Sequence, residues 1–63
     1  MQANPNALLD FDAAAQYLAI GERMLRRLQS QHKVAFVKVG RYVRFTQADL
    51  DDYVDKQTVP ALR

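Results

Sequence analysis

Residues 20–45, IGERMLRRLQSQHKVAFVKVGRYVRF, change from a helical pattern to one rich in β-branched and aromatic residues, and they hold most of the positive charge of this 63-residue chain. Residues 22–44 carry seven Lys and Arg and one acid, a net charge of +6, whereas the segments before and after them each carry −2. A basic centre between acidic flanks predicts one surface that faces a polyanion, rather than a uniformly basic protein.

The first part of this stretch predicts a helix over residues 22–31, with Gly21 as its N-cap. On a helical wheel, Leu25 and Leu28 lie on one side of this helix. The opposite side carries the polar residues Arg23, Arg26, Arg27 and Ser30. One face is therefore expected to pack on the core, and the other to be exposed, where it contacts either a ligand or only solvent. His32 stands where the helix should end, and we expect it to help close the helix.

The second part predicts a short two-stranded ribbon that turns around Gly40. A two-residue loop would place a mixed set of side chains on one face of the ribbon: Val37, Val39, Tyr42 and Arg44. A three-residue loop or a bulge gives these pairs instead: Val39 with Val43, and Val37 with Phe45. We expect the second register, because it makes one face wholly apolar and the buried face sets the register. It also places Lys38 opposite Arg44, with Arg41 at the tip.

Helices are predicted on both sides of this stretch. Before it, LLDFDAAAQYLAI predicts a helix with Asp10 as N-cap and Asp12 in the first turn. Its inward face is expected to consist of Phe11, Ala14, Ala15 and Leu18. After it, FTQADLDDYV predicts a helix that begins with a capping box of Thr46 and Asp49. The expected inward residues of this helix are Leu50, Tyr53 and Val54. The chain is thus divided into an N-terminal tail (1–7), one domain (8–56) and a C-terminal tail (57–63).

Several classes of site are excluded by residue type. The chain has no Cys and a single His, so it lacks the ligands of a zinc site, and DLDDYVD lacks the glycine spacing of a calcium loop. No nucleophile–base pair with an orienting group and no phosphate-cradling glycine loop is present, so we expect no enzyme, no cofactor and no small-molecule substrate. We expect no membrane partner, because the leucines of the basic helix are needed for the core.

Taken in order, LLDFDAAAQYLAIGERMLRRL and VKVGRYVRFTQADLDDYV resemble the excisionase, or recombination directionality factor, family of MerR-like winged helix-turn-helix proteins. The resemblance covers roughly residues 8–55 and depends on Asp10, Ala14, Ala15, Tyr17, Leu18, Arg23, Leu28, Val39, Gly40, Arg41, Arg44, Asp49, Leu50 and Tyr53. The sequence departs from the family pattern at His32, where glycine is usual, and at Ala35, where proline is frequent. The implied fold is mainly α with a two-stranded antiparallel hairpin, in the order helix–turn–helix–hairpin wing–helix.

The resemblance implies binding to double-stranded DNA, with the second helix in the major groove and the hairpin as a wing against the minor groove. The expected major-groove residues are Glu22, Arg23, Arg26, Arg27 and Ser30. The expected wing and backbone contacts are Lys33, Lys38, Arg41 and Arg44. An excisionase binds repeated sites beside a prophage attachment site, bends the DNA and directs a site-specific integrase toward excision. Its further partners would be that integrase and neighbouring copies of itself, in the cytoplasm of a bacterial host.

Two alternatives remain open from the sequence. One is a small MerR-like transcription regulator that uses the same fold at a promoter. The other is a protein-interaction module for which DNA is a secondary partner. Its adhesive residues would be Phe36, expected to face outward, and the tail residues Val59, Ala61 and Leu62.

Overall fold

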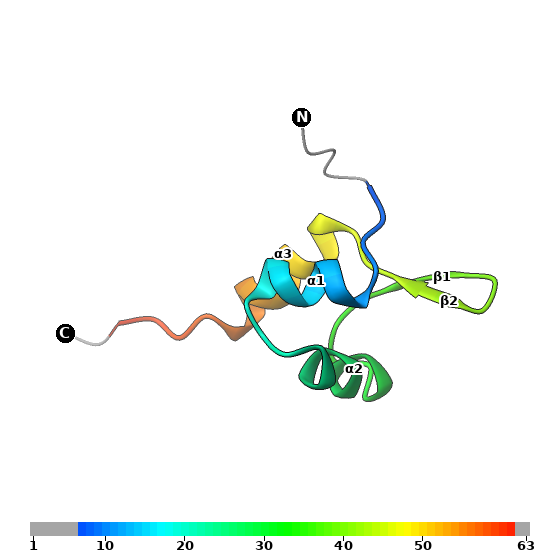
Figure 1. Cartoon of the computed structure of the whole chain (residues 1–63). Coiled ribbons are helices and arrows are strands. Elements are labelled where there is room, and N and C mark those ends of the chain that lie inside the picture. Colours follow the sequence, from blue (N-terminus) through cyan, green and yellow to red (C-terminus); the bar gives the residue numbers. More distant parts are fainter. Residues whose placement is uncertain (1–6, 62–63) are drawn as a thin grey trace.

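The computed structural model describes residues 7–61, which form three helices and a two-stranded antiparallel ribbon (Figure 1). The elements in chain order are α1 (Phe11–Leu18), α2 (Glu22–Ser30), β1 (Val37–Val39), β2 (Tyr42–Arg44) and α3 (Gln47–Gln57). The helices pack together, and the ribbon projects from them as a wing (Figure 1). The mainly helical winged helix-turn-helix that the sequence predicted is therefore confirmed.

The core lies between the three helices and the base of the wing. Its buried members are Ala14, Ala15, Leu25, Leu28, Val34, Phe45 and Leu50. The ring of Phe11 meets that of Phe45 edge to face, with the centroids 5.3 Å apart. Each large apolar side chain that is fully buried contributes about 1.5–3 kcal/mol to the free energy of folding.

The expected inward residues are mostly confirmed, with one exception. Tyr53 is half-buried against the core, but the side chain of Val54 is 48% exposed, so its assignment to the inward face was wrong. Val54 lines a shallow groove at the surface, where no element within residues 7–61 covers it. Helical spacing gives the direction of a side chain but not whether a neighbour reaches it.

Side-chain caps begin two of the helices as the sequence predicted. The carboxylate of Asp10 accepts a hydrogen bond from the backbone N–H of Ala13 at 2.9 Å, at the start of α1. Thr46 Oγ1 accepts from the N–H of Asp49 at 3.0 Å, and the Asp49 carboxylate accepts from the N–H of Thr46 at 3.4 Å. The capping box of α3 is therefore complete, and Gly21 is the N-cap of α2 without a side-chain bond.

Left-handed residues close α1 and α2, and neither residue is glycine. Ala19 has a φ of 58° and His32 a φ of 56°. Around Ala19 the N–H of Ile20 donates to the carbonyl of Ala15, and around His32 the N–H of Lys33 donates to that of Leu28. Both ends therefore have the hydrogen bond that defines a Schellman motif. His32 closes α2 as expected, whereas α1 ends earlier than the glycine in the sequence suggested.

The register of the ribbon corrects the sequence-based expectation. The observed pairs are Val37–Arg44, Lys38–Val43 and Val39–Tyr42, which leaves a two-residue turn of Gly40 and Arg41. The expected pairs of a three-residue loop, and with them Lys38 opposite Arg44, were wrong. Gly40 has a φ of 60°, and a glycine in the first position of a two-residue hairpin turn is a common arrangement.

The apolar partner of Phe45 is not Val37, as the expected register required, but a residue outside the ribbon. Phe45 pairs with Leu9, and the two residues exchange N–H to carbonyl bonds of 2.7 and 2.8 Å. Phe45 is completely buried without facing Val37. Phe36 was expected to face outward, but it is half-buried against the core, and its ring stacks on His32 with a centroid distance of 5.7 Å.

A polar contact ties α1 to α3 at the surface. The hydroxyl of Tyr17 donates to the carboxylate of Asp51 and accepts a bond of 3.0 Å from the side-chain amide of Gln47. The hydrogen bond to Asp51 raises the pKa of Tyr17 above its usual value, because it requires the protonated phenol. This contact fixes the first helix of the helix-turn-helix pair against the last helix.

Candidate nucleic-acid interface

An open groove of about 550 Å³ lies between α2 and the wing, and we call it the α2–wing groove. Its lining residues are Phe11, Arg26, Gln29, Ser30, Arg41, Tyr42, Val43 and Arg44. Four of them are predicted DNA-contacting residues: Arg26, Ser30, Arg41 and Arg44. The fold thus brings three arginines from two separate elements to one concave surface.

The outward face of α2 agrees with the helical wheel. Leu25 is completely buried and Leu28 is 6% exposed, and both belong to the core. The polar residues of this helix are exposed: Glu22, Arg23, Arg26, Arg27 and Ser30. Arg23 and Arg27 stand opposite Leu25 on the wheel, so they face directly away from the body of the protein. Neither of them lines the α2–wing groove.

Arg26 is held in position by residues of two helices. Its Nε and Nη2 atoms donate to Oε2 of Glu22 at 3.0 and 2.6 Å, across one turn of α2. Its Cζ atom lies 4.2 Å from the centroid of the Phe11 ring, which belongs to α1. An ion pair and a cation–π contact therefore fix the guanidinium at the edge of the groove. The carboxylate of Glu22 is engaged by this pair.

The wing presents an aromatic ring between two arginines. The Cζ atoms of Arg41 and Arg44 lie 5.5 and 5.1 Å from the ring centroid of Tyr42, which is 52% exposed. Nη1 of Arg44 also donates to the carbonyl of Val43 at 2.8 Å. These contacts limit the orientations of both guanidinium groups along β2, the strand that lines the groove.

Sequence reasoning did not assign four of the lining residues to this surface: Phe11 and Val43, which were expected on apolar faces, and Gln29 and Tyr42. The two-residue loop would have found Tyr42, because that register places it on the same face as Arg44. Gln29 lies beside the buried leucines on the helical wheel and gave no signal of its own.

The two predicted lysines lie elsewhere. Lys33 lines a separate hollow beside α3, together with Asp52 and Lys56, and not the α2–wing groove. Lys38 is exposed on the wing, but it pairs with Val43 and so stands on the opposite face of the ribbon from Arg44. The nine predicted residues therefore do not all line the α2–wing groove.

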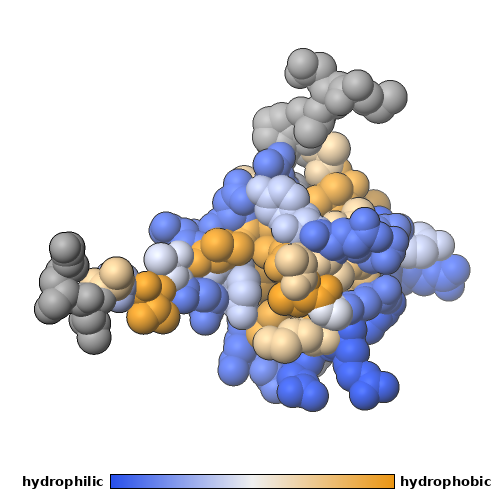
Figure 2. Space-filling model, turned by 60° about the vertical axis from the view of Figure 1, so that its left-hand side comes forward, coloured by the Kyte–Doolittle hydropathy of each residue, from blue (hydrophilic) through white to orange (hydrophobic). Residues whose placement is uncertain are grey.

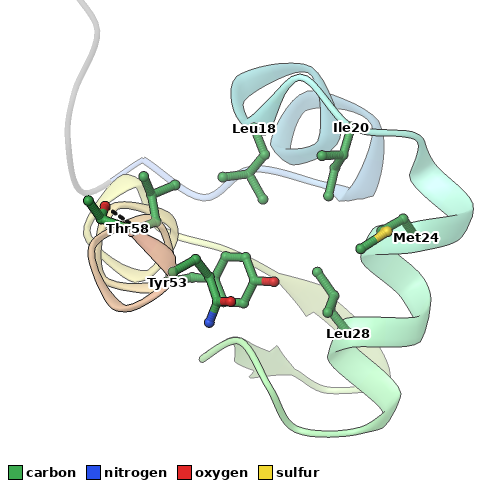
Figure 3. Close-up of a pocket in the computed structure, with 8 residues that line it drawn as sticks. Leu18, Ile20, Met24, Leu28, Tyr53 and Thr58 are labelled. Atoms are coloured by element: carbon green, nitrogen blue, oxygen red, sulfur yellow. Dashed lines mark hydrogen bonds between the residues drawn. The ribbon is translucent and has the colours of Figure 1, made fainter. Parts of the chain in front are cut away.

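A second groove, which we call the apolar groove, lies between the end of α1, one side of α2 and the end of α3 (Figure 3). Its volume is about 260 Å³, and its lining residues are Leu18, Ile20, Met24, Leu28, Tyr53, Val54, Gln57 and Thr58. Hydrophobic residues gather on this side of the molecule with hydrophilic residues around them (Figure 2). No charged residue lines this groove.

Within residues 7–61, no group of three or more His, Cys, Asp or Glu side chains could hold a metal ion. None of the helices described above has both the length and the apolar character needed to cross a membrane.

The comparison that identifies the family is the match of residues 8–58 to the family model described as a helix-turn-helix domain. The chain belongs to this helix-turn-helix family. The family contains excisionase-like DNA-binding proteins, and membership supports DNA as the partner of this chain. Neither the comparison with curated proteins nor the comparison with solved structures found a match.

Proposed function

We propose that this helix-turn-helix protein is a sequence-specific excisionase. It binds repeated sites at a prophage attachment region, bends the DNA and directs a site-specific integrase toward excision. In this role α2 enters the major groove and the wing lies against the adjacent minor groove. The protein acts in the cytoplasm of a bacterial host, contributes no catalysis of its own and contacts neighbouring copies of itself along the DNA.

The observation that carries the proposal is the α2–wing groove, where Arg26, Arg41 and Arg44 meet. A helix in the major groove and a wing in the minor groove must lie on either side of one sugar–phosphate strand. The concave surface between α2 and the wing is where that strand would pass, and it is lined by cations. A solvated arginine face on α2 alone would not require arginines on the wing to face the same hollow.

The first test is the salt dependence of binding to duplex DNA. A duplex selected by the protein from a randomised pool is titrated by fluorescence anisotropy at several salt concentrations. If about five phosphates are neutralised, the slope of log affinity against log salt is about −4 to −5. Arg41→Ala is expected to make the slope less negative by about one unit. Lys56→Ala is the matched control, since it removes one positive charge from α3, where Lys56 pairs with Asp52.

The second test separates an excisionase from a promoter-bound regulator. Footprinting is carried out across the attachment region and the promoters of the element that encodes the chain, followed by an excision assay with its integrase. The expected result is protection in repeated steps at the attachment region. In a gel assay of DNA bending, complexes are expected to migrate more slowly when the site lies at the centre of the DNA fragment than when it lies near an end. Protection only at a promoter would instead identify a small regulator, and an affinity independent of salt would contradict DNA binding itself.

A further inference from the structure

The arginines of α2 occupy two different environments. Arg26 lines the α2–wing groove beside Arg41 and Arg44, and its guanidinium is held by Glu22 and Phe11. Arg23 and Arg27 are exposed on the outermost line of the helix, opposite the buried Leu25. No hydrogen bond or ion pair within residues 7–61 engages either of their side chains.

The contacts of Arg26 decide what it can offer to DNA. Guanine is recognised when the two-pronged edge of a guanidinium meets two acceptors on the base. The carboxylate of Glu22 occupies the Nε–Nη2 edge of Arg26, so only its Nη1–Nη2 end remains free. Beside Arg41 and Arg44 in the α2–wing groove, this end can meet the oxygens of a phosphate, which accept hydrogen bonds over a wide range of directions. Arg23 and Arg27 retain both edges, and they lie on the outermost line of the helix, away from the groove.

From these observations, and on the basis of the function proposed above, we infer that the α2–wing groove is a phosphate clamp formed by Arg26, Arg41 and Arg44. Glu22 and Phe11 are the positioning residues of the clamp, because they hold Arg26 in place. The clamp fixes the register of the protein on one DNA strand, whereas Arg23 and Arg27 contact base edges. Glu22 acts through Arg26 and not by accepting a hydrogen bond from a base.

Two scans of a duplex selected from a randomised pool by the wild-type protein test this division. In the first, each phosphate near the centre of the site is replaced singly by an uncharged methylphosphonate. We expect one position to weaken wild-type binding but to have no further effect on Arg26→Ala, because the contact is already lost. An Arg26→Ala profile that matches the wild-type profile at every position would overturn the assignment of Arg26 to the clamp.

In the second scan, each base pair is substituted singly. Arg26→Ala is expected to weaken every duplex by the same factor and to make the salt slope less negative by about one unit. Arg23→Ala or Arg27→Ala is expected to remove a preference of about 5- to 150-fold at one base pair. If Arg26→Ala instead abolishes the preference at one base pair, Arg26 contacts a base and the inference is wrong.

The positioning role of Glu22 needs a separate comparison. Glu22→Gln and Asp12→Asn each remove one negative charge from the first turn of a helix, but only Glu22 contacts Arg26. If Glu22 positions Arg26, Glu22→Gln reduces the loss of affinity caused by the methylphosphonate at the position that couples to Arg26. Asp12→Asn leaves this loss of affinity unchanged. A penalty in Glu22→Gln equal to or larger than that of wild type would show that Glu22 does not position Arg26.

The outcomes distinguish failure of the clamp from failure of the proposed function. If the selection from the randomised pool enriches no sequence, sequence-specific binding fails before either scan begins. If a sequence is enriched but no methylphosphonate position couples to Arg26, the function stands and the clamp fails. Thermal unfolding followed by circular dichroism shows whether each variant is folded under the binding conditions. Exposed ion pairs one helical turn apart contribute little to stability, so Glu22→Gln is expected to remain folded.

Discussion

The α2–wing groove and the apolar groove lie on either side of the same helix, α2, and they differ in chemical character. One side of α2 gives Arg26, Gln29 and Ser30 to the first groove, and the other side gives Met24 and Leu28 to the second. Leu25 lies between the two sides and is completely buried. The order of residues around a single short helix therefore separates a cationic surface from an apolar one.

This difference shows how a domain of this size can combine a core with a binding surface. A chain this short buries only about 60% of the surface that its unfolded form exposes, so few side chains are available for the core. In α2 only Leu25 and Leu28 are buried, and the exposed residues on the two flanks are free to differ. Substitutions on one flank are therefore expected to act independently of the other.

The largest effect is expected from Leu25→Ala, which removes the buried residue beneath both grooves. Deleting a fully buried leucine side chain costs about 2–5 kcal/mol, a large part of the stability of a small domain. We expect most of the cooperative thermal transition, measured by circular dichroism, to be lost, and DNA binding to be lost with it. Met24→Ala is the control on the exposed flank, since Met24 is 49% exposed. Equal melting temperatures for the two variants would contradict the placement of Leu25.

A smaller effect is expected from substitutions that act on one groove at a time. Arg44→Ala is expected to weaken binding to random-sequence duplex and to make the salt slope less negative by about one unit, because it removes one cation from the α2–wing groove. Met24→Gln, in the apolar groove, is expected to leave the affinity and the slope unchanged. Fluorescence anisotropy measures both. If Met24→Gln weakens DNA binding as much as Arg44→Ala does, the two grooves are not independent.

The smallest effect on stability is expected from a substitution of Ala19, in the turn that joins α1 to α2 near the apolar groove. A non-glycine residue in the left-handed region is strained by about 1–2 kcal/mol, and Ala19 has a φ of 58°. Ala19→Gly is therefore expected to increase the free energy of unfolding by up to about 1 kcal/mol, because glycine relieves the strain at some entropic cost.

Urea unfolding measures this change. The control is Ala48→Gly, the same substitution at an exposed position in the first turn of α3, which is expected to decrease the free energy of unfolding by up to about 1 kcal/mol. Changes of the same sign in both variants would show that the backbone at Ala19 is not strained in solution.

The parts of the fold and of the site that the sequence predicted correctly depend on contacts between residues close together in the chain. Asp10, Thr46 and Asp49 cap their helices because a cap is completed within three residues. The two faces of α2 follow from helical spacing alone. The sequence predicts one basic surface, and in the structure Arg26, Arg41 and Arg44 line one groove, whereas Lys33 and Lys38 do not line it.

The register of the wing could not be predicted from local patterns in the sequence. Within the ribbon alone, a three-residue loop gives the better apolar face, and the sequence therefore favours it. The structure instead buries Phe45 by pairing it with Leu9 and packing it on Phe11. These partners are more than 30 residues away in the chain, so no local pattern in the ribbon could have indicated them. Because Phe45 is buried by Leu9 and Phe11, the two-residue turn at Gly40 forms without leaving Phe45 exposed.

The amino-acid sequence by itself determined the order of the elements, the helix caps and the separation of leucines from arginines on α2, because these follow from contacts between residues less than about one or two turns apart. Only the tertiary structure decided the register of the wing, the Phe11 ring that contacts Arg26 beside the wing arginines, and the exposure of Val54. Each of these depends on which distant segment packs against the residue, and burial of a shared core, not local spacing, makes that choice.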